Sequence, residues 1–172
     1  MKVITLSGCP LKRGNVARLT DMLLKEIGTS GKYGSIPNVD IAPCKSCDAC
    51  VKTGSCIIKS DQWSSIAKNM LKSDLIIIGS PVYFYGISGP LKTFLDRTYS
   101  MWHKRRLKGK RTILFSVGSH GADEALDMLR LWAQAHEMKI IGTVTSTHGK
   151  FRDIEKDKNI RQEIKKIKKQ FN

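Results

Sequence analysis

The sequence predicts an α/β fold: a doubly wound sheet of five parallel strands in the order 2-1-3-4-5. Strand-like and helix-like segments alternate along the 172 residues, as in a chain of βα units. Residues 74–79, DLIIIG, are apolar almost throughout, which is typical of a strand buried on both faces. Glycine-rich turns follow the first, third and fourth expected strands and precede helices, where such sheets bind ligands. We expect one domain over residues 1–172.

The first βα unit begins with a strand at residues 2–7. Residues that break regular structure follow it: Gly8, Pro10 and Gly14. Asn15 can cap the next helix, whose apolar residues recur at helical spacing: Val16, Leu19, Leu23 and Ile27. A helix N-terminus after such a turn presents free N–H groups to an anion, and Lys12 and Arg13 add charge. The turn is neither a P-loop nor GxGxxG, so an ordinary βα turn is an equal alternative.

Residues 28–35 are expected to form a loop, and residues 36–41 a second strand that leads into a cysteine-rich segment. That segment, residues 44–56 (CKSCDACVKTGSC), holds four of the chain's five cysteines: Cys44, Cys47, Cys50 and Cys56. The spacing C-x2-C-x2-C-x5-C can direct these thiolates toward one centre, as an iron–sulfur cluster requires. Flanking lysines favour the thiolate form, and Gly54 lets the segment fold back.

Three other readings of the cysteines stay open. Structural zinc also takes four thiolates, but its ligands usually come as two well-separated pairs. Disulfides would fit a secreted protein, which nothing else in the sequence indicates. The cysteines could also be plain small residues in a tight loop.

The third βα unit carries three consecutive aromatic residues in a loop. A short helix beginning at Ser60 or Asp61 leads into the strand at residues 74–79, after which Pro81 sets a turn. The aromatic residues that follow are Tyr83, Phe84 and Tyr85, and exposed aromatic side chains are costly in water. We expect them to line a flat ligand; packing onto a neighbouring subunit is a compatible alternative. The next helix has an apolar face: Leu91, Phe94, Leu95 and Thr98.

Two further units complete the pattern. Residues 110–117 form a fourth strand, followed by a glycine-rich turn at residues 118–121 and a helix with apolar positions at Leu126, Leu129, Leu131 and Trp132. His120 could donate a hydrogen bond or a proton to a ligand, although a lone histidine is more often structural. Residues 139–145 form a fifth strand, and the last helix has one apolar stripe: Ile160, Ile164, Ile167 and Phe171. In the order 2-1-3-4-5 the three glycine-rich turns converge, and we expect the cysteine-rich segment at the same end of the sheet.

The formal net charge is +15, which suits nucleic acid, an acidic protein or an anionic cofactor. Nucleic acid is not expected, because no stacking aromatics recur at regular spacing, and a solvated basic surface is the preferred reading of the charge. No apolar run approaches the roughly 18 residues of a membrane span, and no secretory signal is apparent. We therefore expect a cytoplasmic protein with reduced thiols and no membrane partner.

Over nearly its whole length the sequence resembles the flavodoxin-like NADPH-dependent FMN reductase superfamily, and within it the iron–sulfur flavoproteins of anaerobes. Residues 8–16, GCPLKRGNV, stand where that family commonly has GSPRKNGNT. Residues 80–97, SPVYFYGISGPLKTFLDR, are similar to its SPVYFGSVSAQLKAFIDR. Two positions depart from the pattern: Cys9 replaces a usual Ser and Val16 a usual Thr, so two hydroxyl donors are missing.

The resemblance implies a cofactor site made of three loops and a separate metal site. The loop expected to hold the FMN phosphate comprises Ser7, Cys9, Pro10, Lys12, Arg13, Gly14, Asn15 and Val16. The loop expected to hold the isoalloxazine ring comprises Pro81, Val82, Tyr83, Phe84, Tyr85 and Gly86. A third, looser contact comprises Gly118, Ser119, His120 and Gly121. The expected ligands of a 4Fe–4S cluster are Cys44, Cys47, Cys50 and Cys56. No residue is assigned as catalytic.

The leading hypothesis from the sequence is an FMN- and 4Fe–4S-containing flavoprotein that transfers electrons. The resemblance also implies a homodimer or dimer of dimers, with one subunit's cluster near another's flavin. The positive charge suits an acidic electron carrier such as a ferredoxin. The alternative is a cluster-free NAD(P)H-dependent reductase of FMN, quinones or nitro compounds, with NAD(P)H as substrate. A basic nucleic-acid-binding module with structural zinc is a third hypothesis, but it leaves the aromatic loop unexplained.

Overall fold

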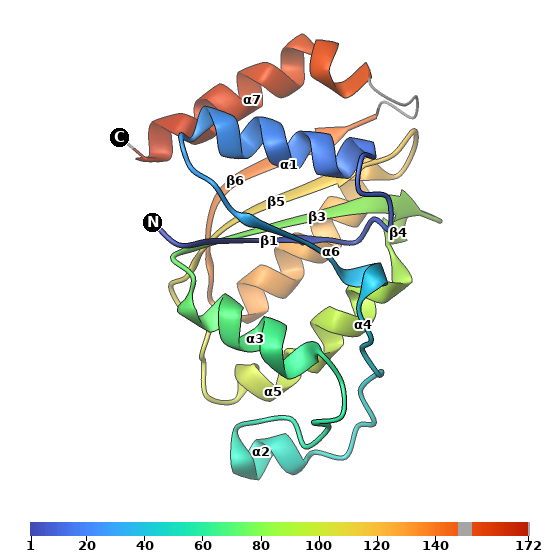
Figure 1. Ribbon diagram of the computed structural model, residues 1–172, viewed down its shortest axis with the longest axis vertical. Helices are drawn as coiled ribbons and strands as arrows, with labels where there is room; N and C mark the ends of the chain where they lie inside the picture. The colour runs from blue at the N-terminus through green and yellow to red at the C-terminus, as the bar shows by residue number, and fades with distance from the viewer. Residues whose placement is uncertain (148–152, 172) are drawn as a thin grey trace.

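A parallel sheet forms the centre of the protein in a computed structural model that describes residues 1–147 and 153–171 (Figure 1). Its strands lie in the order β2-β1-β3-β5-β6, and every neighbouring pair on this path is parallel. These strands are β1 (Val3–Ser7), β2 (Lys32–Ser35), β3 (Leu75–Tyr83), β5 (Arg111–Val117) and β6 (Lys139–Ser146). Strand β4 (Gly86–Ile87) is an antiparallel addition to β3. Apart from β4, this is the predicted order 2-1-3-4-5.

Helices cover both faces of the sheet (Figure 1). Helices α1 (Asn15–Glu26) and α7 (Lys158–Lys168) lie on one face, and α3 (Trp63–Lys72), α4 (Gly89–Arg97) and α6 (Ala122–Ala135) lie on the other. Helix α5 (Tyr99–Trp102) directly follows α4, and α2 (Ala49–Thr53) lies inside the cysteine-rich segment. Short 3-10 helices in the described part of the chain are η1 (Ile36–Asn38), η2 (Asp153–Lys156) and η3 (Lys169–Phe171). Among the described residues no helix combines the length and apolarity that a membrane crossing needs.

Strand β3 joins two hydrophobic clusters, one on each face of the sheet. Ile76 and Ile78 belong to the cluster beneath α3, α4 and α6, whereas Leu75 and Ile77 belong to the cluster beneath α1 and α7. Because successive side chains of a strand point to opposite faces, a strand covered on both sides must be apolar at every position. This explains why the run at 74–79 was the clearest strand signal.

The second strand lies earlier than predicted. The sequence placed it at residues 36–41 and a loop at residues 28–35, but β2 occupies Lys32–Ser35 and pairs in register with β1 from Ile4↔Lys32 to Ser7↔Ser35. Pro37 cannot donate a ladder hydrogen bond, and it lies in the first turn of η1 instead. Pairing with β1 therefore overrides the weak strand propensity of KYGS.

Four smaller predictions need correction as well. Pro81 does not set a turn, because β3 continues through it and pairs it with Val117. Asn15 is the first residue of α1 and not its cap, because Gly14 holds the extended N-cap position. Helix α3 begins at Trp63, two residues after Asp61, whose carboxylate accepts a hydrogen bond from the Trp63 N–H at 3.2 Å. Leu131 does not face the core, since 66% of it is exposed.

A buried polar network fixes the C-terminal end of α4 to α6. The Thr98 hydroxyl lies 2.9 Å from His136 Nε2, donates to the Leu95 carbonyl at 2.6 Å, and accepts from Trp132 Nε1 at 2.9 Å. With its proton given to Leu95, this hydroxyl accepts from His136, which places the imidazole proton on Nε2. Burial lowers the pKa of His136 to about 4, so the ring is neutral at physiological pH.

Gly79 tests the packing at the centre of the sheet. A Cβ atom at this position would lie 2.0 Å from Cζ of Phe115. Gly79→Ala should lower the free energy of unfolding in urea by about 1–3 kcal/mol, because the ring has to move. The double change with Phe115→Leu should recover part of that loss.

Gly89→Ala is the matched control, because no atom lies within 4 Å of the added Cβ and α4 begins there. Its effect should stay within about 0.5 kcal/mol. Equal stabilities of the Gly79 and Gly89 variants would contradict the described packing of β3 against β5.

Candidate functional site

The loop after β1, residues 8–14, packs against the start of α4. The Gly8 N–H donates to the Gly79 carbonyl at 2.8 Å. A Cβ atom on Gly8 would lie 2.5 Å from Ser88 Oγ and 3.1 Å from Ser80 Oγ. Because only glycine fits this junction, the carboxyl end of β1 and the segment after β3 come into direct contact.

The segment after β3 in turn packs against the turn after β5. A Cβ atom on Gly118 would lie 2.5 Å from Val82 Cβ, and one on Gly121 would lie 2.8 Å from Tyr85 Cα. Gly121 also has a φ of 72°, which favours glycine. The structure therefore brings the three predicted loops together at the carboxyl edge of the sheet, as the sequence analysis expected.

The aromatic loop is a tight hairpin between β3 and β4. Tyr83 pairs with Gly86, which leaves Phe84 and Tyr85 as its two-residue turn, with φ values of 47° and 62°. Such turns favour Asn-Gly, because positive φ at both positions strains residues with large side chains. Phe84 is fully exposed and Tyr85 is 63% exposed. Strain that holds apolar rings in solvent is a sign of a functional site.

Hydrogen bonds from within the loop, from β2 and from η1 hold the loop after β1 in place. The Ser7 hydroxyl accepts a hydrogen bond from the Cys9 N–H at 3.1 Å. Ser35 Oγ donates to the Cys9 carbonyl at 2.8 Å, and Asn38 Nδ2 donates to the Pro10 carbonyl at 3.0 Å. Neither hydrogen bond could be predicted from the sequence while the second strand was expected after Ser35.

The side chains of this loop divide into buried and exposed groups. Cys9 and Val16, the two departures from the family pattern, are buried in the cluster beneath α1 and α7. Lys12 and Arg13 are exposed, and Asn15 is half-buried at the start of α1. An anion at this loop would therefore meet backbone N–H groups, the α1 N-terminus and flexible cations.

One buried hydroxyl at this edge has no hydrogen-bond partner. Ser88 Oγ, on the N-cap residue of α4, is fully buried beside Gly8 and makes no hydrogen bond. A buried donor without a partner costs about 1–3 kcal/mol, so an acceptor supplied by a ligand at this junction would stabilise it. The residues at this edge thus fit an anionic cofactor, and Ser88 is a candidate that the sequence analysis missed.

The four clustered cysteines line one small cavity. Cys44, Cys47, Cys50 and Cys56 share its wall with the end of α4 and with α5. Burial raises the pKa of the Cys50 thiol, and the charges of the other three cysteines raise it further. The other three thiols therefore lie close enough to Cys50 for electrostatic interaction with it.

Left-handed backbone turns shape this segment. Ser46 and Asp48 both have a φ of 50°, and Gly54 has a φ of 68° at the C-terminus of α2. The Gly54 N–H donates to the Cys50 carbonyl at 2.8 Å, which closes α2. The expectation that Gly54 lets the segment fold back is confirmed.

The spacing of the thiols bears on the kind of metal centre. Four thiolates around one zinc ion at ~2.3 Å must approach one another to within about 4 Å. In residues 1–147 and 153–171 no three His, Cys, Asp or Glu side chains are close enough to hold one ion. A 4Fe–4S cluster gives each thiolate its own iron and so needs more widely spaced sulfurs. The four thiols that line one cavity are the donor type that a 4Fe–4S cluster takes, so the chemistry of this donor set fits a cluster.

The location of the cysteine-rich segment differs from the prediction. It does not lie at the carboxyl edge with the three loops. It hangs below the layer of α3, α4 and α5, on the side away from the sheet (Figure 1), and its cavity is lined by Arg97, Tyr99 and Ser100. The physical reason is its anchoring: its flanks bind the far end of α4.

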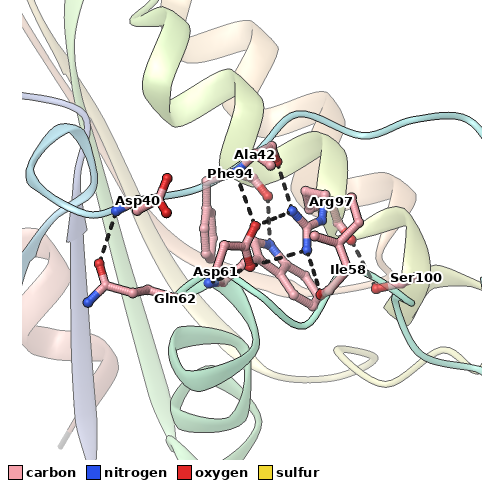
Figure 2. A network of polar contacts seen from close by, with 9 residues as sticks. Asp40, Ala42, Ile58, Asp61, Gln62, Phe94, Arg97 and Ser100 are labelled. Atoms are coloured by element: carbon pink, nitrogen blue, oxygen red, sulfur yellow. Dashed lines mark hydrogen bonds and ion pairs between the residues drawn. The ribbon is translucent and has the colours of Figure 1, made fainter.

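A buried ion pair provides that anchoring (Figure 2). Arg97 Nη1 lies 2.6 Å from Asp61 Oδ2, with both side chains almost fully buried. Nη1 also donates to the Ala42 carbonyl at 2.7 Å, and Nη2 donates to the Ile58 carbonyl at 3.2 Å. Ala42 and Ile58 flank the cysteines on either side, so one guanidinium clamps both ends of the segment.

The Asp61 carboxylate of this ion pair has backbone hydrogen-bond partners as well. Its Oδ2 accepts a hydrogen bond from the Ala42 N–H at 3.0 Å. On the other side of the pair, the Arg97 guanidinium lies 5.0 Å from the centre of the Trp63 ring. Burial opposes ionisation, but hydrogen bonds from Arg97, Ala42 and Trp63 lower the pKa of Asp61 overall. The pair is thus charged, and the sequence analysis missed it because its partners lie far apart in the chain.

The sequence model of the family described as NADPH-dependent FMN reductase matches residues 1–153. The chain belongs to this family. An iron–sulfur flavoprotein of Methanocaldococcus jannaschii is 32% identical over 148 residues, covering 83% of this chain and 76% of the relative. An iron–sulfur flavoprotein of Methanosarcina thermophila is 32% identical over 149 residues, covering 83% and 78%. These relatives assign the chain to the iron–sulfur flavoprotein branch.

Solved structures support the fold. A flavodoxin from the domain Archaea superposes with a TM-score of 0.64 at 12% identity and covers 99% of both chains. An apo NADH:FMN oxidoreductase gives a TM-score of 0.68 at 16% identity, covering 99% of this chain and 90% of the other. The predicted flavodoxin-like fold is therefore confirmed, and family membership makes the protein an FMN-dependent oxidoreductase.

Substitutions in the strained hairpin should change the stability of the apoprotein and its affinity for FMN in opposite directions. Replacing Phe84 and Tyr85 together by Asn and Gly should raise the free energy of unfolding of the apoprotein by about 1–2 kcal/mol, because positive φ no longer costs energy. The same change should weaken FMN binding, because two aromatic rings are lost. Urea unfolding and fluorescence titration with FMN measure the two effects.

Phe84→Leu is the control for this pair of effects. It removes one ring but keeps the strained backbone, so FMN affinity should fall without a gain in stability. Unchanged FMN affinity in the double variant would show that the hairpin does not contact the flavin.

Proposed function

We propose that this protein transfers electrons with two resident cofactors, FMN at the carboxyl edge of the sheet and a 4Fe–4S cluster in the cysteine cavity. The observation that carries the proposal is the shared cavity of all four clustered cysteines. Relatives at 32% identity bear the name iron–sulfur flavoprotein, which agrees with it.

The flavin half of the proposal assigns roles to the three loops. Backbone N–H groups of residues 8–14 and the α1 N-terminus bind the phosphate, with Lys12 and Arg13 nearby. Phe84 and Tyr85 cover the ring, and residues 118–121 border it. Ser88 Oγ donates to the cofactor from the start of α4. No residue is given a proton-transfer role.

In the metal half, Cys44, Cys47, Cys50 and Cys56 each supply one thiolate. Flavin exchanges two electrons and the cluster one, so together they connect the two kinds of carrier. The chain's part is to exclude water, hold the thiolates and set the local charge. Thiolate ligation requires reduced cysteines, so a cytoplasmic location belongs to the proposal.

The proposal includes a homo-oligomer. Within one chain the cysteine-rich segment lies below the helical layer, whereas the three loops lie at the edge of the sheet (Figure 1). A second copy that places its cysteine cavity against the first copy's hairpin would bring the two cofactors together. The exposed aromatic tip at Phe84 suits such a contact.

An acidic electron carrier such as a ferredoxin is the proposed partner. Exposed lysines lie in and beside the cysteine-rich segment: Lys45, which lines the cavity, and Lys52, Lys59 and Lys104. The stem of Lys104 packs against α2, since it lies 3.1 Å from where a Cβ of Gly54 would be. This cluster places positive charge where electrons would enter the metal site.

A cluster-free NAD(P)H-dependent reductase is the second candidate. An NAD(P)H-dependent FMN reductase of Saccharomyces cerevisiae is 33% identical over 86 residues, covering 50% of this chain and 41% of the relative. In that case the cysteines would have no redox role, and quinones, nitro compounds or flavin would be reduced at the three-loop edge.

Metal content decides between the two candidates. Anaerobically purified protein should show flavin absorption bands over a broad shoulder, with about four irons and four labile sulfides per chain. Cys47→Ser should lose the iron and keep the flavin. A clean flavin spectrum without iron, even after reconstitution with iron and sulfide, would favour the cluster-free reductase.

Cys9→Ser is the matched control for metal content. It makes the same chemical change at the fifth cysteine, which is buried outside the cavity and packs beneath α1. This variant should keep its iron. If it loses iron while Cys47→Ser retains it, the assignment of the ligands is wrong.

Ionic strength tests the proposed partner. The rate of reduction by an acidic ferredoxin should fall as salt rises, because screening weakens attraction between surface charges. The triple change of Lys45, Lys52 and Lys59 to Gln should flatten that dependence. As a control, the rate of reduction by a small uncharged reductant should not depend on salt. If the rate of reduction by ferredoxin is equally independent of salt, an acidic ferredoxin is not the partner.

A further inference from the structure

Arg97 carries one donor that no protein group uses. Its side chain is almost fully buried, at 1% exposure. Nη1 and Nη2 bond to the carbonyls that flank the cysteines and to Asp61, but Nε is buried and has no hydrogen-bond partner. The clamp described above therefore explains four of the five N–H bonds that a guanidinium offers and leaves one unexplained.

This guanidinium forms part of the wall of the cysteine cavity. Arg97 lines that cavity together with the four cysteines. An arginine guanidinium keeps its charge in proteins, and Cys56 is the cysteine with which this guanidinium interacts. A permanent positive charge thus borders the cavity on the side of Cys56.

A purely mechanical role does not account for the free N–H. Leaving a buried donor unsatisfied costs about 1–3 kcal/mol, and a brace for two carbonyls has no need of it. An acceptor inside the cavity would satisfy the donor. The sulfur atoms of a thiolate-bound cluster are such acceptors, and hydrogen bonds to them raise the cluster's reduction potential.

We propose that Arg97 is a positioning residue of the metal site: its Nε–H donates to a sulfur of the cluster on the Cys56 side and holds the reduction potential up. The inference rests on the proposed function, because it requires the cluster. Reduction adds one negative charge to the cluster, so a nearby cation and donor stabilise the reduced form more than the oxidised form.

The charge of Asp61 determines how strong the electric field of the Arg97 guanidinium is at the cysteine cavity. Its carboxylate lies 2.6 Å from Nη1 and offsets much of the guanidinium charge. In Asp61→Asn the amide oxygen still accepts a hydrogen bond, but the offsetting charge is gone. The field of Arg97 at the cavity then becomes stronger, and the reduction potential should rise.

The test is a redox titration of the cluster, followed by electron paramagnetic resonance, on loaded protein and four variants. The potentials should follow the order Arg97→Gln, Arg97→Lys, wild type, Asp61→Asn, from lowest to highest. At a fixed potential, Arg97→Gln should lower the ratio of reduced to oxidised cluster roughly tenfold, or about 59 mV for a one-electron couple. Lys keeps the charge without the Nε–H, so its shift should be smaller.

Lys92→Gln is the control. It removes a positive charge from the same helix, where Lys92 is half-exposed and pairs with Asp96, and it should leave the potential unchanged. If Arg97 only braced the segment, its variants would bind less cluster, but the reduction potentials of the remaining clusters would not follow the order given above.

A second measurement needs no variant. In loaded wild-type protein grown with 15N-arginine, pulsed electron paramagnetic resonance of the reduced cluster should detect a weakly coupled 15N nucleus. Within the described residues, Arg97 is the arginine that lines the cavity. No coupling, together with potentials that ignore Arg97 and Asp61, would overturn the inference while leaving the cluster assignment intact. Wild-type protein that takes up no iron and sulfide would overturn both.

Discussion

The organisation of the cysteine cavity depends on one buried ion pair. Arg97 and Asp61 join the start of α3, the end of α4 and both flanks of the cysteine-rich segment. Removing two charges from water is costly, and their mutual attraction repays that cost only when further hydrogen bonds satisfy them. Here the carbonyls of Ala42 and Ile58 and the N–H groups of Ala42 and Trp63 do so. A segment with almost no apolar core of its own thereby gains a defined shape.

The three-loop edge is instead held by close packing around glycines, without charge. Gly8, Gly118 and Gly121 each lie where a Cβ atom would come within 3 Å of a residue on a neighbouring segment. The loops consequently hold one another in place, and their side chains remain available for a ligand. Strain is confined to the hairpin tip, where Phe84 and Tyr85 adopt positive φ in solvent. The molecule thus builds one site from a charge pair and the other from glycine contacts.

The sequence was informative wherever a local pattern reflects burial or turn chemistry. The apolar run of β3, the helical spacing in α1 and the glycine-rich turns predicted the sheet and its edge. Strand β2 was displaced because KYGS carries no strand pattern and forms only by pairing with β1. The cysteine-rich segment was misplaced because its anchor is distant: Ala42 and Arg97 are 55 positions apart in the chain. Ser88, likewise, became visible only through its burial without a partner.

Helix α4 touches both candidate sites. Its N-cap residue, Ser88, lies against Gly8, and its last residue, Arg97, lies in the wall of the cysteine cavity. At 1.5 Å per residue, these ends are separated by roughly 13 Å of rigid rod. Suppose that occupancy at one end depends on the position of this rod. Thermodynamic reciprocity then requires that filling either site change the affinity of the other by the same factor. Under that condition, α4 couples the two sites even within a single chain.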